Sequence, residues 1–197
     1  MPTPTYRSKL ILASSSPRRR QLLGEAGYDF EVVAPSELAE CGVCSGESPP
    51  ELVARLAYQK AADVSTRIGP ALIVACDTVA ECQGQVLGKP RDEDHARVML
   101  TLLSGKRHCV YSGLCIWRVP AGEPVVRVAK TTLRMDALSP DKIAAYVATG
   151  AWEGKAGAFG YQDGLDWVHI EQGSESNVVG LPMELLAEML ADAPAAD

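Results

Sequence analysis

Residues 10–23 have the sequence LILASSSPRRRQLL, which indicates a strand, a tight turn and the start of a helix. The apolar run over 8–13 has strand character, Ser16 is a residue type favoured at helix N-caps, and Pro17 suits a first helical position. A helix that begins there directs backbone N–H groups and the positive end of its dipole toward the preceding turn. Three arginines add positive charge at the same end. The stretch therefore predicts a site for an anion, and a phosphate chain suits it best.

The three arginines point in different directions around this predicted helix, residues 17–27. At about 100° per residue, Arg19 falls in the middle of the inward face, Arg18 at its edge and Arg20 roughly opposite. That face is defined by the apolar residues Leu22, Leu23 and Ala26. One interpretation is that these arginines are simply solvated. Cations at a helix N-terminus oppose the dipole, however, so we predict that Arg18 and Arg19 bind an anion and assign Arg20 to solvent.

The composition is that of a folded globular protein. The chain has 197 residues, of which 47% are hydrophobic and 22% charged, enough for one core or two small lobes. A net charge of −6 argues against a general nucleic-acid-binding protein, because phosphate backbones require clustered basic surface. No run approaches about 18 apolar residues and the N-terminus lacks signal-peptide features, so we expect a cytoplasmic protein with no membrane partner.

Six cysteines are many for this length, but a chain with this much apolar sequence needs no disulfide framework. Cys41 and Cys44 form a lone CxxC pattern. A structural zinc site needs a second pair at suitable spacing, and the other cysteines do not provide one. We therefore interpret the thiols as buried or incidental.

Lys60 lies near the centre of the apolar stripe of a helix predicted from Ser48 to about Arg67. Ser48 and Glu51 form a capping box at its start. Burying an unpaired ammonium group is expensive, so Lys60 is expected to have a functional partner. The alternative is a side chain that snorkels from the edge of the core.

Asp77 follows a nearly continuous apolar run over 71–76, which predicts a central strand ending at this residue. Reactive groups in α/β proteins often stand at the carboxyl ends of buried strands. The alternative is that Asp77 caps a turn. A hairpin with its turn near 83–85 follows, and Pro90 ends its second strand, which leaves Lys89 at the strand's exit.

The rest of the chain also consists of predicted helices and strands. It has no internal repeat and no linker, so we predict one domain over 1–197. The segment 154–164 is rich in glycine and contains Gln162 and Tyr161, which suit hydrogen bonding to and stacking on a base. The remaining predicted elements are helices over 92–103, 139–150 and 182–191 and strands over 30–33, 108–118, 124–135 and 166–171. Antiparallel hairpins beside buried strands favour an α/β fold with a mixed sheet.

Clustered cations with a carboxylate suit phosphoryl chemistry, in which cations spread the developing charge and the carboxylate holds metal or activates water. The chain resembles the Maf family of nucleoside triphosphate pyrophosphatases. The resemblance covers nearly the whole chain, in order: SSSPRR (14–19), RLAYQKA (55–61), DTV (77–79), GKP (88–90), LSG (103–105), KAGAFGYQ (155–162) and SNVVGLP (176–182). It implies hydrolysis between the α and β phosphates with Mg²⁺ or Mn²⁺. It also implies a bent mixed sheet with a cleft between two lobes, similar to the inosine triphosphatase fold.

The resemblance also implies roles for individual residues. The triphosphate would be bound by Ser14, Arg19, Lys60 and Lys89, with the two lysines also catalytic. Asp77 would be a general base or a metal ligand. The family has an acidic metal-site residue after the second strand, where this chain is about one residue longer, and we choose Glu40 over Glu37.

Three positions bear on the substrate. Arg18 after Ser-Pro, Thr78 after the aspartate and Gln162 in the glycine segment resemble the dTTP/UTP pyrophosphatase branch. A 7-methyl-GTP enzyme tends to have an aromatic and an acidic residue at the first and last of these positions, whereas an amide suits a neutral pyrimidine. Two alternative functions remain open. The chain could be a 7-methyl-GTP pyrophosphatase, or it could be a nucleotide-binding regulator of septum formation with little turnover. The resemblance also suggests a homodimer.

Overall fold

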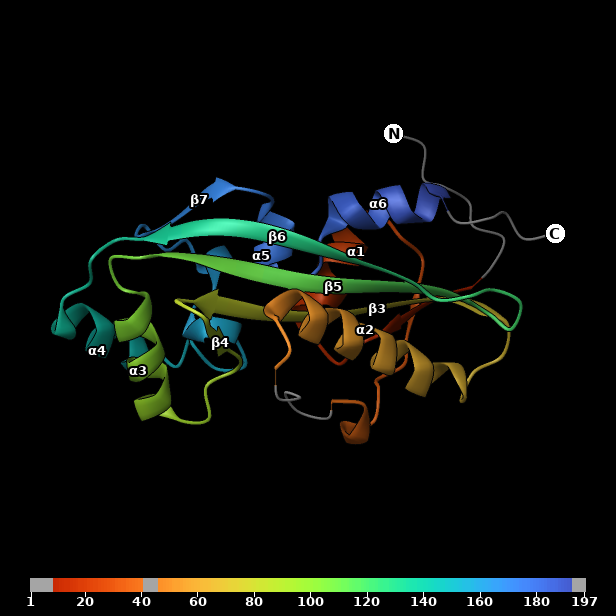
Figure 1. The fold of residues 1–197 in the computed structure, drawn as a ribbon, viewed down its shortest axis with the longest axis horizontal. Helices are drawn as coiled ribbons and strands as arrows, with labels where there is room; N and C mark the ends of the chain where they lie inside the picture. The colour runs from red at the N-terminus through yellow and green to blue at the C-terminus, as the bar shows by residue number, and fades with distance from the viewer. Residues whose placement is uncertain (1–8, 41–45, 193–197) are drawn as a thin grey trace. The chain divides into compact units, whose positions relative to one another are not determined.

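The computed structural model describes residues 9–40 and 46–192, apart from the side chain of Glu40. Seven strands form one mixed sheet in the order β2-β1-β3-β5-β6-β7, with β4 paired to β3 (Figure 1). The strand β1 is parallel to β2 and β3, whereas β3/β4 and β6/β7 are antiparallel, which confirms the predicted mixed α/β fold. The strands are β1 (Leu10–Ala13), β2 (Glu31–Val32), β3 (Ala71–Cys82), β4 (Gln85–Leu87), β5 (Arg107–Val119), β6 (Val125–Met135) and β7 (Val168–Gln172).

Six α-helices and three short 3₁₀ helices connect these strands within the described residues. Several begin as the sequence predicts, with proline in the first turn or an acidic or hydroxyl cap; Asp92 Oδ1, for example, accepts from the His95 N–H at 2.8 Å. The helices are α1 (Pro17–Glu25), η1 (Glu37–Glu40), α2 (Pro49–Ser65), α3 (Glu93–Leu103), α4 (Pro140–Ala148), η2 (Ala156–Ala158), η3 (Tyr161–Asp163), α5 (Glu175–Val179) and α6 (Met183–Asp192). None of the described helices is long and apolar enough to span a membrane.

The chain divides into two compact units, and β3, β5 and β6 each contribute residues to both. The first unit comprises the described parts of 1–77, 112–129 and 180–197. The second comprises 78–111 and 130–179. Each unit has a core of its own.

In the first unit, the central strands are buried on both faces. Along β1, Leu10 and Leu12 pack in a cluster with α1 and α6, while Ile11 and Ala13 pack in another with α2. The first half of β3 alternates in the same way. Burial on both faces explains why these strands are continuous apolar runs rather than alternating ones.

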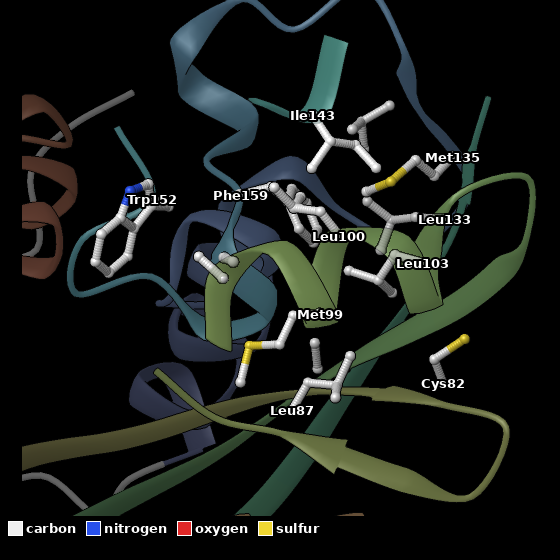
Figure 2. Close-up of a cluster of buried hydrophobic side chains, with 14 of the residues drawn as sticks. Cys82, Leu87, Met99, Leu100, Leu103, Leu133, Met135, Ile143, Trp152 and Phe159 are labelled. Atoms are coloured by element: carbon white, nitrogen blue, oxygen red, sulfur yellow. The ribbon is translucent and has the colours of Figure 1, made fainter. Parts of the chain in front are cut away.

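The core of the second unit is the cluster shown in Figure 2. Its side chains come from the end of β3, from α3 and α4, from β6, and from the segment before β7. Trp152 and Phe159 belong to that segment, so the glycine-rich stretch is part of the packed core of this unit.

Two sequence predictions of secondary structure are wrong. The strand β3 does not end at Asp77 but continues to Cys82, because its second half pairs with β4 in the register Ala80↔Leu87. The hairpin turn is where it was predicted, with Gln83 at φ 53° and Gly84 at φ 79°. The segment 173–182, predicted as a polar loop, contains the short helix α5.

Candidate active site

Ser14 and Arg19 form a buried hydrogen-bonded cluster where β1 leads into α1. The Ser14 hydroxyl oxygen accepts from the Ser16 backbone N–H at 3.1 Å and from Arg19 Nη1 at 3.3 Å. Arg19 Nε donates to the carbonyl oxygen of Gly180 at 2.7 Å. Ser14 is 3% exposed and Arg19 9% exposed. The predicted direction of Arg19 is therefore confirmed, and its guanidinium is fixed by the protein itself.

The start of α1 also sorts the neighbouring arginines as predicted, with Arg18 half-buried and Arg20 exposed. Ser16 is at the N-cap position, as predicted, although its side chain makes no capping hydrogen bond in the described part of the chain. The backbone N–H groups of a first helical turn point out of the end of the helix. An anion is a suitable partner for them.

Lys60 and Asp77 form an ion pair in which the ammonium nitrogen lies 2.6 Å from Asp77 Oδ1. The side chains are 5% and 15% exposed, so water screens the pair only weakly. Lys60 comes from the buried face of α2, and Asp77 from the middle of β3. The ammonium predicted to need a partner has one, and it is the predicted reactive carboxylate.

The two clusters lie at the same end of the paired part of β1 and β3 in the first unit. In the parallel pair β1/β3, Ala13 is in register with Ala75, so Ser14 and Asp77 both follow the last paired positions. Adjacent strands are about 4.8 Å apart. The carbonyl oxygen of Gly180 links the Ser14–Arg19 cluster to β3, because it accepts from Arg19 and, at 3.3 Å, from the thiol of Cys76, the residue before Asp77. Asp77 therefore lies just past the paired positions of β1 and β3, although β3 continues past it.

Three of the predicted residues, Thr78, Lys89 and Gln162, belong to the second unit and are described within it. Lys89 is exposed and stands two residues after β4, which ends at Leu87 and not at Pro90 as predicted. The Gly157 N–H donates to the carbonyl oxygen of Gly88 at 3.0 Å, so the glycine-rich segment is bonded to the residue before Lys89. Gln162 is the exposed central residue of η3.

Glu37 and Glu40 are the first and last residues of η1, but the structure does not describe the side chain of Glu40. The choice between them stays a prediction. Cys41 and Cys44 lie outside the described residues. Over the described part of the chain, no three His, Cys, Asp or Glu side chains gather into a group that could hold a metal ion.

The family model described as "Maf-like protein" matches residues 9–193. The chain belongs to the Maf-like protein family.

The relatives of this Maf-like protein include three that are named dTTP/UTP pyrophosphatase. The one from Rhodopirellula baltica is 57% identical over 182 residues, which is 92% of this chain and 80% of the relative. The one from Pyrococcus abyssi is 44% identical and the one from Geotalea uraniireducens 41%, covering 92% and 90% of this chain and 94% and 91% of those relatives.

Solved structures of Ham1 proteins share the fold of the Maf-like chain. The Staphylococcus aureus Ham1 protein has a TM-score of 0.53 at 13% identity, covering 93% of this chain and 98% of that one. A HAM1 protein from Coxiella burnetii has a TM-score of 0.53 at 14% identity, covering 94% and 100%. At such low identity the likeness shows the fold alone, and it confirms the mixed α/β architecture.

Sequence reasoning missed two polar groups that make buried hydrogen bonds in this Maf-like protein. The Gly180 carbonyl is one. Asn177, 1% exposed, is another: its amide nitrogen donates to Val110 O at 3.2 Å and to Thr131 Oγ1 at 2.9 Å in the second unit. A lone asparagine beside two valines and a glycine in SNVVGLP was the available signal, because a polar side chain buried there needs partners.

Proposed function

We propose that this protein is a nucleoside triphosphate pyrophosphatase that hydrolyses dTTP and UTP to the monophosphate and pyrophosphate. The observation that carries the proposal is the buried Lys60–Asp77 ion pair beside the Ser14–Arg19 cluster at one strand edge. It combines a helix start suited to phosphate with a carboxylate held in a buried position by Lys60. The relatives that bear the name dTTP/UTP pyrophosphatase support the same activity.

The triphosphate is bound by cations and by the start of α1. Ser14 and Arg19 line the strand edge, and backbone N–H groups of the first helical turn add donors of fixed direction. Lys60 and the exposed Lys89 supply further positive charge. Ser14, Arg19 and Lys60 are held by contacts within the first unit, and their donors favour the extra negative charge that develops on the phosphate oxygens during the reaction.

Asp77 acts as the general base in this proposal. It accepts a proton from a water molecule whose oxygen attacks the α-phosphorus, the bond from that phosphorus to the bridging oxygen breaks, and pyrophosphate leaves. Lys60 fixes the position of the Asp77 carboxylate through the 2.6 Å contact. An ammonium group has three N–H donors, so the same lysine can also contact a phosphate oxygen.

The family resemblance implies a divalent metal, Mg²⁺ or Mn²⁺, and the carboxylate of Asp77 is a donor of the kind that such a metal prefers. Asp77 has a hard oxygen ligand beyond the Oδ1 atom paired with Lys60, and Mg²⁺ is commonly held by one or two carboxylates together with substrate phosphates. We propose Asp77 and Glu40 as its protein ligands. When bound, the metal neutralises charge on the phosphate chain.

The base is selected by Arg18, Thr78 and Gln162 in this proposal. The amide of Gln162 both donates and accepts, which matches the imide edge of uracil or thymine. The protein is further proposed to be a cytoplasmic homodimer, an assembly that light scattering on the purified chain would test.

A substrate panel tests the proposed activity. Pyrophosphate release is measured with dTTP, UTP, CTP, GTP and 7-methyl-GTP, each with Mg²⁺ and with Mn²⁺. The proposal expects the highest kcat/KM for dTTP and UTP. A clear preference for 7-methyl-GTP would contradict the substrate assignment, and binding without turnover of any triphosphate would favour a regulator.

A further inference from the structure

Lys155 and Asp163 form an ion pair that the proposed mechanism does not use. The Lys155 ammonium group donates to Asp163 Oδ2. The two residues are eight positions apart and close a loop, 155–163, that contains both η2 and η3. Their side chains are 13% and 26% exposed, so the pair is better shielded than an ordinary surface ion pair.

The backbone of Gly160 runs directly against this pair. A Cβ atom on Gly160 would lie 2.5 Å from Lys155 Nζ and 2.5 Å from Asp163 Oδ2, closer than atoms can approach. The Asp163 N–H in turn donates to the Gly160 carbonyl oxygen at 3.1 Å, which closes the turn of η3. Ion pair, glycine and turn therefore form one tightly packed unit.

The lysine end of the loop is anchored to the core of the second unit. The Lys155 N–H donates to the carbonyl oxygen of Trp152 at 3.2 Å, and the indole N–H of Trp152 donates to Val147 O in α4 at 2.9 Å. The two residues of the ion pair are thus held in different ways. Lys155 is fixed to the body of the unit, whereas Asp163 belongs to a short exposed turn.

Gln162 is in that exposed turn, between Tyr161 and Asp163. A three-residue 3₁₀ turn has poor hydrogen-bond geometry and little stability of its own. Tyr161 packs against the core of the second unit, whereas Gln162 and Asp163 are exposed, so core packing holds only the first residue of η3. The link from Asp163 to the anchored Lys155 is the contact best placed to fix the direction of Gln162.

We propose that the Lys155–Asp163 ion pair positions Gln162 and thereby sets the preference for the base. This inference rests on the proposed function, in which Gln162 contacts the pyrimidine. Lys155 and Asp163 are positioning residues that act through the turn of η3 and do not touch the substrate.

The test measures kcat and KM for UTP and CTP with Lys155→Met and Asp163→Asn, singly and together. Lys142→Met is the matched control, because Lys142 pairs with Asp166 in the same unit at 3.3 Å while both side chains are largely exposed. We expect the preference for UTP over CTP to fall about tenfold to a hundredfold in either single variant, mainly through KM. The double variant should be no worse than the singles, Lys155→Arg should recover part of the preference, and Lys142→Met should keep all of it.

Amide hydrogen exchange over 161–164 separates failure of this inference from failure of the proposed function. Exchange should accelerate in Lys155→Met and Asp163→Asn but not in Lys142→Met. If Gln162→Ala leaves the preference for UTP over CTP unchanged, the proposed base contact is wrong. Amide hydrogen exchange then remains as the test of whether the ion pair holds the turn of η3. Unchanged exchange in both variants would overturn the inference. An equal loss of kcat with both substrates in Lys155→Met, with Asp163→Asn unaffected, would also overturn it, because Lys155 would then act on the phosphates.

Discussion

Arg19 Nε lies 2.7 Å from the carbonyl oxygen of Gly180, although 161 positions separate the two residues in the chain. The contact ties the first turn of α1 to the segment that enters α6. Because Cys76 donates to the same oxygen, one backbone carbonyl links the start of α1 to the strand that carries Asp77. A backbone group therefore helps to organise the candidate site alongside its charged side chains.

Replacing Arg19 by lysine should cost both stability and substrate affinity. Lysine retains the charge but cannot reach Ser14 and Gly180 at the same time with the geometry of a guanidinium. We expect a loss of about 1.5–3 kcal/mol in the free energy of unfolding, as for other hydrogen bonds to charged groups, and a raised KM for UTP. Urea titration and initial rates measure the two effects. Arg20→Lys is the control. An equal loss in that variant would refute the claim that Arg19, unlike the exposed Arg20, stabilises the protein through its buried hydrogen bonds.

Gly113→Ala should displace α2 and with it Lys60. A Cβ atom on Gly113 of β5 would lie 2.1 Å from the Val53 carbonyl oxygen, so the helix backbone must move. We expect destabilisation of about 1–3 kcal/mol, the range for overpacked cores, together with a reduced kcat. The matched control is Gly24→Ala in α1, where no described atom outside the helix backbone and adjacent residues lies within 4 Å of the new Cβ. That variant should be stabilised by up to about 1 kcal/mol, because alanine is the better helix former.

His108 should make the protein sensitive to acid. Burial lowers the pKa of His108 to about 4, whereas an unfolded histidine has a pKa near 6.5. Between these values the unfolded state takes up a proton that the folded state does not, so stability is lost as the pH falls from about 6.5 to about 4. The shift corresponds to about 3 kcal/mol. The free energy of unfolding at pH 7 and pH 4 should differ less in His108→Leu than in the wild type, and an equal pH dependence would contradict the assignment.

Exchanging Gln162 for glutamate tests the proposed base contact. A carboxylate accepts but cannot donate, so the preference should move from dTTP and UTP toward bases that donate hydrogen bonds or carry positive charge, such as 7-methylguanine. The ratio of kcat/KM values for UTP and 7-methyl-GTP measures the change. An unaltered ranking of substrates would mean that the specificity site lies elsewhere.

The directions of Arg19 and Lys60 could be predicted from the sequence because helical periodicity alone places a residue on the inward or outward face. The course of β3 could not. Its apolar run stops at Cys76 and aspartate is disfavoured in strands, but pairing with β4 overrides that local preference. The Gly180 carbonyl and the Lys155–Asp163 pair were also out of reach, because neither a backbone atom nor a contact inside a glycine-rich loop has a periodic signal.

Turnover of UTP by Asp77→Asn is the sharpest test of Asp77 as the general base. Asparagine keeps the shape of Asp77 but cannot accept the proton, and circular dichroism would check that the variant is folded. Pyrophosphate release should fall by about 10²–10⁴-fold, the contribution of a general base, whereas the exposed control Asp166→Asn should keep its rate. Turnover by folded Asp77→Asn within a few-fold of the wild type would rule out Asp77 as the general base.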